Sequence, residues 1–324
     1  MQLIARFAFF ICALLVAAAA GAQAWPARPL NMIVPYAAGG NVDAVARWVG
    51  PELAKRLGQP VVVENVAGAG GVIGTERAAR ASANGYSILL SVESTIIAAK
   101  LVSPSIVKYD GLKDFQPITL LATAPLVLVG KPALAPNTLD ELLQLLRAQP
   151  GKLNYATSGV GTSLHIAGEM INQQGGVQMT HVPYKAGAQI VTELMGNQVD
   201  LAVLPVPLIA EQVRSGKVKA YAVTEPQRLP ALPNIPSTAE SRALKAVDVS
   251  VWFGLFAPAG AERAIITRIH QEAAEILKQD DIREKFANFG MRTAGLGPEE
   301  FSRFLVTDFD KFSAVVRAAG IRAE

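Results

Sequence analysis

The 324-residue sequence is poor in the residues that hold metals, form disulfides or carry thiol chemistry. It contains one cysteine, Cys12, and three widely spaced histidines, with no HExxH or His-x-His pattern. These absences exclude a disulfide framework and a thiolate site, and we predict no metal or other cofactor. Charged residues make up 18% of the chain, the formal net charge is +3 and no basic run occurs, so we predict no nucleic-acid partner.

Long apolar runs are scarce as well, with one informative stretch at the N-terminus. Residues 1–24 contain FAFFICALLVAAAA and end at Ala22-Gln23-Ala24, a small-x-small pattern typical of a cleaved signal peptide. The stretch is short for a bilayer core of about 30 Å, so we predict no membrane-spanning mature chain. We expect an exported, periplasmic protein whose mature chain starts at Trp25 and, without Cys12, has no cysteine.

From Trp25 onward, short β-rich runs alternate with helical patterns. The first runs predict strands at 30–36, 60–65 and 86–92, with a helix between each pair. Parallel neighbours in a sheet need a crossover of a dozen or more residues, which these helices supply. The pattern therefore predicts an α/β fold with helices on both faces of a parallel sheet.

A second α/β unit lies between two proline-rich segments, and a strand at 249–260 and two terminal helices follow it. These last elements need a sheet to cover, and the simplest packing returns them to the first unit. We therefore predict two doubly wound lobes joined by two crossing strands. Lobe 1 is discontinuous (25–124 and 248–324), and lobe 2 covers 125–247. Two crossings make a hinge, and the cleft between lobes is a preferred place for a ligand.

The loop after the first predicted strand has the construction of an anion site. It opens a helix, where unpaired backbone N–H groups and the positive end of the helix dipole face outward. Two glycines let a ligand approach the backbone, and Asn41 or Asp43 can cap the helix. The alternative is a capped helix start without a ligand. The candidate ligand-binding residues are Tyr36, Ala37, Ala38, Gly39, Gly40 and Asp43.

The segment after the strand KLNYATS repeats this construction with glycine-spaced hydroxyl residues. With one such loop in each lobe, backbone donors would hold a carboxylate from both sides when the lobes close. A hydrogen bond to a charged group contributes about 1.5–3 kcal/mol, and a micromolar site needs about 8 kcal/mol. The candidate residues in this loop are Ser158, Gly159, Gly161, Thr162 and Ser163.

A third glycine loop, GAGGVIG at 68–74, leaves three interpretations open. It lies between a strand and a helix and imitates a dinucleotide fingerprint, so the alternative function is an exported enzyme that binds a nucleotide. Against this, the loop follows the second strand of the predicted sheet. We favour a third loop that lines the cleft through Ala69 and Gly70, and a purely structural turn is the remaining interpretation.

Catalytic patterns are weak, so we predict that the protein is not an enzyme. Ser163 and His165 are two residues apart on one helix, where they face different directions, and no G-x-S-x-G motif occurs. His165 is more typical of a residue that supports a site from behind or packs in the core.

Glu93 is an unexpected acid at the carboxyl end of the third predicted strand, where the cleft should open. A carboxylate there repels an anionic ligand unless it meets a cation. One hypothesis is therefore a ligand that carries an amino or ring-nitrogen group beside its carboxylate. The alternative is that Glu93 caps the following helix or points to water.

The mature chain carries IVPYAAGGNVDAVAR, GAGGVIG, ATSGVGTSLHIAGE, HVPYKAGAQIVTELMGNQVD and FGLFAPAG in that order. Together they resemble the Bug family, the periplasmic solute-binding receptors associated with tripartite tricarboxylate transporters. The resemblance implies a type II periplasmic-binding-protein fold in which two α/β lobes close over a small carboxylate.

The resemblance also implies site residues and partners. The family's carboxylate is held between the loops that match 36–43 and 158–163, mainly by backbone amides and bridging waters, and Tyr184 and Lys185 would line the same cleft. Pro205 stands where the family commonly has a polar or acidic strand end. The identity of the ligand is therefore left open among di- or tricarboxylates, aromatic acids and amino acids. We expect a monomer that delivers this ligand to a membrane transporter or a sensor.

Overall fold

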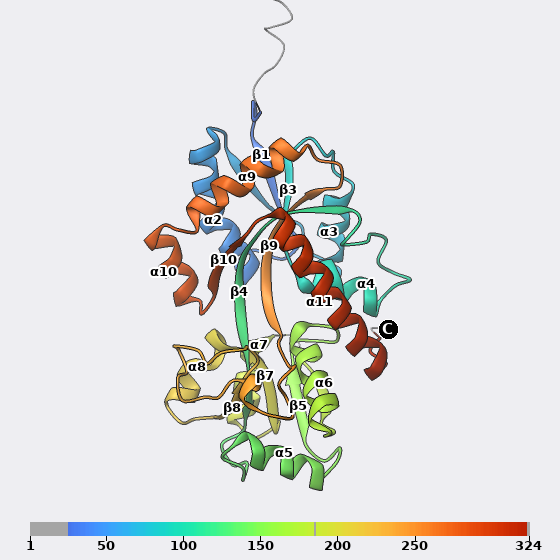
Figure 1. The fold of residues 1–324 in the computed structure, drawn as a ribbon, viewed down its shortest axis with the longest axis vertical. Helices are drawn as coiled ribbons and strands as arrows, with labels where there is room; N and C mark the ends of the chain where they lie inside the picture. The colour runs from blue at the N-terminus through green and yellow to red at the C-terminus, as the bar shows by residue number, and fades with distance from the viewer. Residues whose placement is uncertain (1–24, 185, 323–324) are drawn as a thin grey trace, which may run out of the picture.

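A computed structural model describes residues 25–184 and 186–322; the predicted signal segment and Lys185 lie outside the described residues. The chain forms two α/β lobes joined by two long strands, β4 (Phe115–Gly130) and β9 (Ser250–Pro258), which run between the lobes in Figure 1. Within the described part, none of the helices is both long and apolar enough to cross a membrane.

The first lobe is a mixed sheet with the strand order β2-β1-β3-β9-β4. β1 is parallel to both β2 and β3, whereas β9 runs antiparallel to β3 and β4. The elements of this lobe, besides β4 and β9, are β1 (Leu30–Val34), α2 (Asn41–Leu57), β2 (Val61–Asn65), η1 (Ala69–Gly71), α3 (Val72–Ala79), β3 (Ser87–Val92), the π-helical turn η2 (Ser94–Ala98), α4 (Ala99–Val102), α9 (Arg263–Ile276), α10 (Asp280–Asn288), β10 (Arg292–Leu296) and α11 (Pro298–Ala319).

The second lobe is built on the other half of β4. That half pairs antiparallel with β7 and β8, and β5 is parallel to β6 and β7. The elements of this lobe are α5 (Leu139–Ala148), β5 (Asn154–Thr157), α6 (Ser163–Gly175), β6 (Thr180–Pro183), α7 (Gly187–Met195), β7 (Leu201–Pro205), α8 (Val206–Arg214), β8 (Lys219–Val223) and η3 (Thr238–Glu240).

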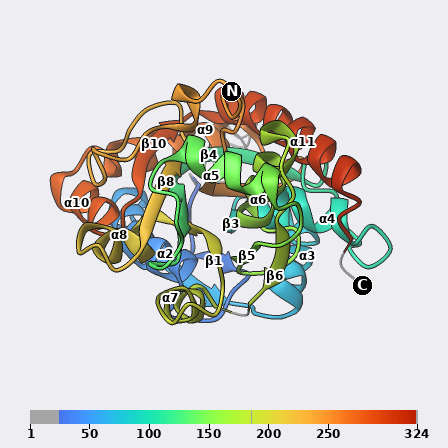
Figure 2. The same cartoon turned by 90° about the horizontal axis from the view of Figure 1, so that it is seen from below.

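The two lobes share β4 because its apolar run is long enough to serve both sheets. Thr119 to Pro125 pair with β9, and Leu126 to Gly130 pair with β7. Leu126, Val127, Leu128 and Val129 are fully buried, which fits a strand covered on both faces. Helix α11 lies alongside α4 and α6 in both Figure 1 and Figure 2, so it spans the two lobes on one side.

Helix α2 illustrates how sequence periodicity builds the core of the first lobe. Val45, Val49 and Leu53 recur every four residues on one face, and all three are fully buried in a cluster that also contains residues of α9. Burial of each side chain contributes roughly 1.5–3 kcal/mol. This packing fixes the N-terminus of α2, and with it the loop that follows β1.

The predicted α/β fold, with two lobes, two crossing strands and a cleft, is confirmed. The expectation of a parallel sheet is wrong in part, because the crossing strands β4 and β9 pair antiparallel with their neighbours and make the sheet mixed. The predicted strands at 30–36, 60–65 and 86–92 appear as β1, β2 and β3 with ends shifted by one or two residues. Among the α-helices and strands of the described residues, α8, β8, α10 and β10 were not predicted from the sequence.

Candidate ligand-binding site

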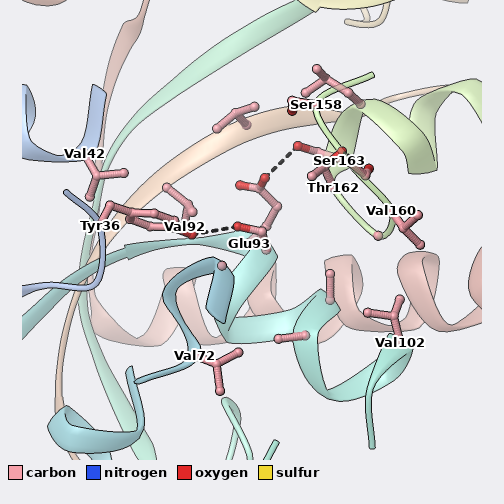
Figure 3. Close-up of a pocket in the computed structure, with 18 of the residues that line it drawn as sticks. Tyr36, Val42, Val72, Val92, Glu93, Val102, Ser158, Val160, Thr162 and Ser163 are labelled. Carbon is pink, nitrogen blue, oxygen red and sulfur yellow. Dashed lines mark hydrogen bonds between the residues drawn. The ribbon is translucent and has the colours of Figure 1, made fainter. Parts of the chain in front are cut away.

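A cavity of about 740 Å³ lies between the lobes. Its first-lobe wall comes from the segments around the ends of β1 and β3, from η1, η2 and α4, and from β9; its second-lobe wall comes from the loop before α6 and from the starts of α7 and α8. Figure 3 shows Tyr36, Glu93 and Ser163 around this space. The predicted site residues that line it are Tyr36, Ala69, Gly70, Glu93, Ser158, Gly159, Gly161, Thr162, Ser163 and Pro205.

The tip of the first loop does not line the cavity. Ala37, Ala38, Gly39 and Gly40 are exposed in the turn before α2. Asn41 and Val42, which form the first turn of α2, line the cavity in their place. The loop therefore contributes its two ends, Tyr36 and the helix N-terminus, rather than its glycines.

Asp43 shapes this loop from behind. Its Oδ2 accepts hydrogen bonds from the Gly39 N–H (2.9 Å) and from Arg47 Nε (2.8 Å), and its Oδ1 accepts one from Asn65 Nδ2 (3.0 Å). The hydrogen bond from Arg47 is the main cause that lowers the pKa of Asp43 to about 2. Asp43 is buried and holds the turn closed as a fixed carboxylate.

The predicted capping of this helix by Asn41 or Asp43 is wrong. The N-cap is Gly40, and no side chain caps it. Asn41 is already the first helical residue, and Asp43 reaches past the cap to Gly39. The first N–H groups of an α-helix have no partner within the helix, so the positive end of α2 stays available at the cavity, where Asn41 and Val42 lie.

The second loop leads into α6, whose N-cap is Thr162. The Thr162 hydroxyl accepts a hydrogen bond from the His165 N–H (3.4 Å) and donates one to the Gly159 carbonyl oxygen (2.9 Å). Gly161 has φ +77°, and a Cβ there would come within 2.9 Å of Val102 in the first lobe. Glycine is thus required at this point of contact between the two lobes beside the cavity.

His165 supports this loop and does not line the cavity. Its Nδ1 accepts a hydrogen bond from the Gly161 N–H (3.1 Å), and its ring stacks on His181 with the centroids 3.8 Å apart. His181 Nε2 shares a hydrogen bond with the Thr157 hydroxyl (2.6 Å). Burial lowers the pKa of His165 to about 3 and that of His181 to about 4, so both rings are neutral at pH 7.

The third loop lines the cavity through Ala69 and Gly70. Two of its glycines are explained by packing. A Cβ on Gly71, whose φ is +97°, would lie 2.7 Å from the Thr95 side chain, and one on Gly74 would lie 2.4 Å from the carbonyl oxygen of Val66. These close approaches account for the glycine spacing without a bound nucleotide.

Glu93 bridges the two lobes. Its carboxylate accepts hydrogen bonds from the Ser163 hydroxyl at the start of α6 (Oγ–Oε1 2.6 Å) and from the Trp252 backbone N–H on β9 (3.2 Å), and Figure 3 shows the carboxyl directed toward Ser163. Glu93 is 3% exposed, and this burial raises its pKa to about 7. The expected alternative, a helix cap or a side chain in water, is wrong, because the side chain makes no cap hydrogen bond and is buried between the lobes.

Trp252 connects Glu93 to a second buried acid. Its indole Nε1 donates to Asp308 of α11 (2.9 Å), and Asp308 pairs with Lys311 (3.3 Å). Burial raises the pKa of Asp308, against the lowering effect of Lys311. Through Trp252, the carboxylates of Glu93 and Asp308 therefore hold β9 from two sides where this strand passes the cavity.

The apolar part of the cavity was not predicted. Its main side chains are Val102 and Ile106 on the first lobe, Leu208 on α8, and Val251 and Phe253 on β9. Of these, only Val251 and Phe253 could be placed on one face from the sequence, because residues two apart on a strand point to the same side. The others come from segments that meet only in the folded chain.

Tyr184 lies away from the cavity lining. It is half-buried against the core of the second lobe, and its backbone N–H donates to the Thr157 carbonyl oxygen (2.8 Å). The nearby residue that does line the cavity is Gly187, at the start of α7.

Comparisons with known proteins agree with this architecture. The family model described as tripartite tricarboxylate transporter family receptor matches residues 45–321. BugT of Bordetella pertussis is 34% identical over 321 residues, which covers 99% of this chain and 98% of BugT. The periplasmic binding protein BugD has a TM-score of 0.75 at 33% identity, covering 93% of this chain and 100% of BugD. MatC from Rhodopseudomonas palustris, solved with bound malate, has a TM-score of 0.75 at 30% identity, covering 90% of this chain and 100% of MatC.

Two α/β lobes, two crossing strands and a cavity between the lobes define a solute-binding receptor with the type II periplasmic-binding-protein fold. The chain belongs to the tripartite tricarboxylate transporter receptor family. The resemblance to the Bug family is thereby confirmed.

Proposed function

We propose that the protein is an exported receptor that captures a small carboxylate between its lobes without converting it. The observation that carries this proposal is that two helix N-termini from different lobes meet at one cavity. The cavity is lined by Asn41 and Val42 at the start of α2 and by Ser163 and Leu164 at the start of α6. Helix N-termini present free N–H groups and a positive dipole end, which favour an anion.

The carboxylate would contact both lobes only when the cleft is closed. A ligand shifts a conformational equilibrium by its difference in affinity for the two states. The closed state would therefore be stabilised by the ligand, with β4 and β9 as the hinge between lobe 1 (25–124 and 248–324) and lobe 2 (125–247). Malate bound to MatC, a relative of the same fold, supports a carboxylate as the ligand class.

A thermal-shift screen of the purified protein tests this proposal. The panel contains mono-, di- and tricarboxylates, aromatic acids and amino acids, with their amides as uncharged controls and NADH to test for nucleotide binding. A ligand at about 100 times its dissociation constant should add roughly 2.7 kcal/mol to the stability. Stabilisation by amides as strong as by acids, or by NADH alone, would contradict the proposal.

The family to which the chain belongs supports a delivery step. We propose that the loaded monomer presents its ligand to membrane components of a tripartite tricarboxylate-type transporter or to a sensor in the periplasm. N-terminal sequencing of the exported protein should give Trp25 as the first residue. An intact residue 1 on the exported protein would show that the N-terminal segment is not a cleaved signal.

A further inference from the structure

The cavity is apolar over most of its surface. Three of the large apolar side chains that the fold leaves exposed line it: Ile106 is 57% exposed, Val160 38% and Leu208 36%. Phe253, which is buried, and Val251, which is partly buried, add an apolar wall from β9. An apolar ligand group that fills the cavity would remove these exposed side chains from water, which favours binding.

The described wall of the cavity carries one charged side chain. Among the described residues that line it, Glu93 is the single acidic residue, and none is lysine, arginine or histidine. The carboxylate of Glu93 accepts hydrogen bonds from Ser163 and Trp252, which are both uncharged donors. A carboxylate has about four acceptor positions, so this buried acid retains capacity for a donor supplied by the ligand.

These two features select a class of ligand within the receptor function proposed above, on which the inference rests. We propose that the ligand is an amino acid with an apolar side chain: its carboxylate lies at the N-termini of α2 and α6, its ammonium group binds Glu93, and its side chain lies against Ile106, Leu208 and Phe253. A cavity of about 740 Å³ is within the range of small-molecule sites, about 300–1,000 Å³, and has room for such a side chain.

The buried carboxylate of Glu93 favours this zwitterion over a diacid. A dicarboxylate would bring a second negative charge into a cavity that already holds Glu93, and like charges at close range raise the energy of the ionised pair. Its second carboxylate would also lie among apolar side chains, where an ionised group without a partner is strongly disfavoured. An ammonium group has the opposite effect, since it pairs with Glu93 in a place shielded from water.

Isothermal titration calorimetry of the purified protein at pH 7.5 tests the inference. L-phenylalanine and L-leucine are compared with 3-phenylpropionate, which lacks the amino group, with phenethylamine, which lacks the carboxylate, and with malate and adipate. We expect each amino acid to bind at least tenfold more tightly than every compound that lacks one of its two charges, a difference of about 1.4 kcal/mol or more.

A variant pair assigns the effect to one residue. Glu93→Gln keeps the size of the side chain and removes its charge, so we expect it to weaken phenylalanine binding at least tenfold and to leave 3-phenylpropionate binding unchanged or tighter. Glu211→Gln, on a side chain that is 74% exposed on α8, is the matched control and should bind as the wild type does.

The outcomes separate this inference from the function on which it rests. Tighter binding of diacids or of 3-phenylpropionate than of both amino acids would overturn the inference and leave a carboxylate receptor. Equal weakening of both acids by Glu93→Gln would overturn the role of Glu93. Binding of none of these acids at millimolar concentration would overturn the inference and contradict the proposed function. If Glu93→Gln does not fold, the wild-type comparison of phenylalanine with its two single-charge analogues decides alone.

Discussion

Glu93→Gln is expected to stabilise the ligand-free protein in neutral and alkaline solution. Burial raises the pKa of Glu93 from its ordinary 4.5 to about 7. Between these pH values the folded protein holds a proton that the unfolded chain has released, so the free energy of unfolding falls as the pH rises. The stability contribution is complete below about pH 4.5 and is lost once the pH passes about 7.

The magnitude follows from this difference in pKa. With about 1.4 kcal/mol for each tenfold change in the ionisation constant, the ionised side chain lowers the stability at pH 8 by on the order of 3 kcal/mol. Glutamine avoids this loss and keeps both contacts, since its oxygen accepts from the Trp252 N–H and its amide donates to the Ser163 hydroxyl. Because Glu93 is 3% exposed, solvent screening removes little of the effect.

Urea unfolding followed by tryptophan fluorescence between pH 5 and pH 8.5 measures the effect. The wild type and the control Glu211→Gln should lose stability in parallel as the pH rises, and Glu93→Gln should lose about 3 kcal/mol less. Other titrating groups, such as Asp308, are common to all three proteins and largely cancel in the difference. A Glu93→Gln curve that runs parallel to the wild-type curve would show that Glu93 does not titrate in this range.

Three further predictions concern the loops around the cavity. Asp43→Ala removes the acceptor of the Gly39 N–H, so its urea midpoint at pH 7 should fall. The wild type should lose about 2 kcal/mol in its free energy of unfolding as the pH drops from about 4 to 2, because the pKa of Asp43 is lowered to about 2. The Asp43→Ala variant should lack this loss. Gly74→Ala should lower Tm, since its Cβ would lie 2.4 Å from a backbone oxygen, whereas the helical control Gly50→Ala, with its nearest neighbour at 3.6 Å, should leave Tm unchanged or higher. The imidazole of His165, whose pKa is lowered to about 3, should not titrate between pH 5 and pH 8 by NMR; a midpoint near 6.5 would contradict its burial.

Much of the fold was predictable because its signals are local. The helix of Val45, Val49 and Leu53 shows its buried face in its own spacing, and each predicted strand is a short β-rich run. Helix α8 was not predicted, and Pro205 and Pro207 lie at its start. Proline is tolerated in the first turn of a helix, where its missing N–H has no intrahelical partner, and α8 starts at Val206.

In the candidate site, too, the features with local signals were predicted and those that depend on distant contacts were not. Glycine-rich turns after strands marked the loops near Tyr36, Gly70 and Ser163, because such a turn is read from neighbouring residues. The contact of Asp43 with Gly39 was not predicted, since the sequence does not specify which backbone group the carboxylate reaches. His165 was expected to support a site or to pack in the core, and its hydrogen bond with the Gly161 N–H agrees with this expectation. The apolar wall depends entirely on how distant segments pack across the cleft.

The position of Glu93 explains how a ligand would drive closure in the proposed receptor. The hydrogen bond between Glu93 and Ser163 crosses the cleft, so an opening of the lobes would break it and expose the carboxylate to water. In the closed state the ionised Glu93 therefore carries a cost of desolvation that an open state would lack. An ammonium group that pairs with Glu93 offsets this cost only when the lobes are closed. Its binding energy thus differs between the two states, which is the condition for a ligand to shift the equilibrium toward closure.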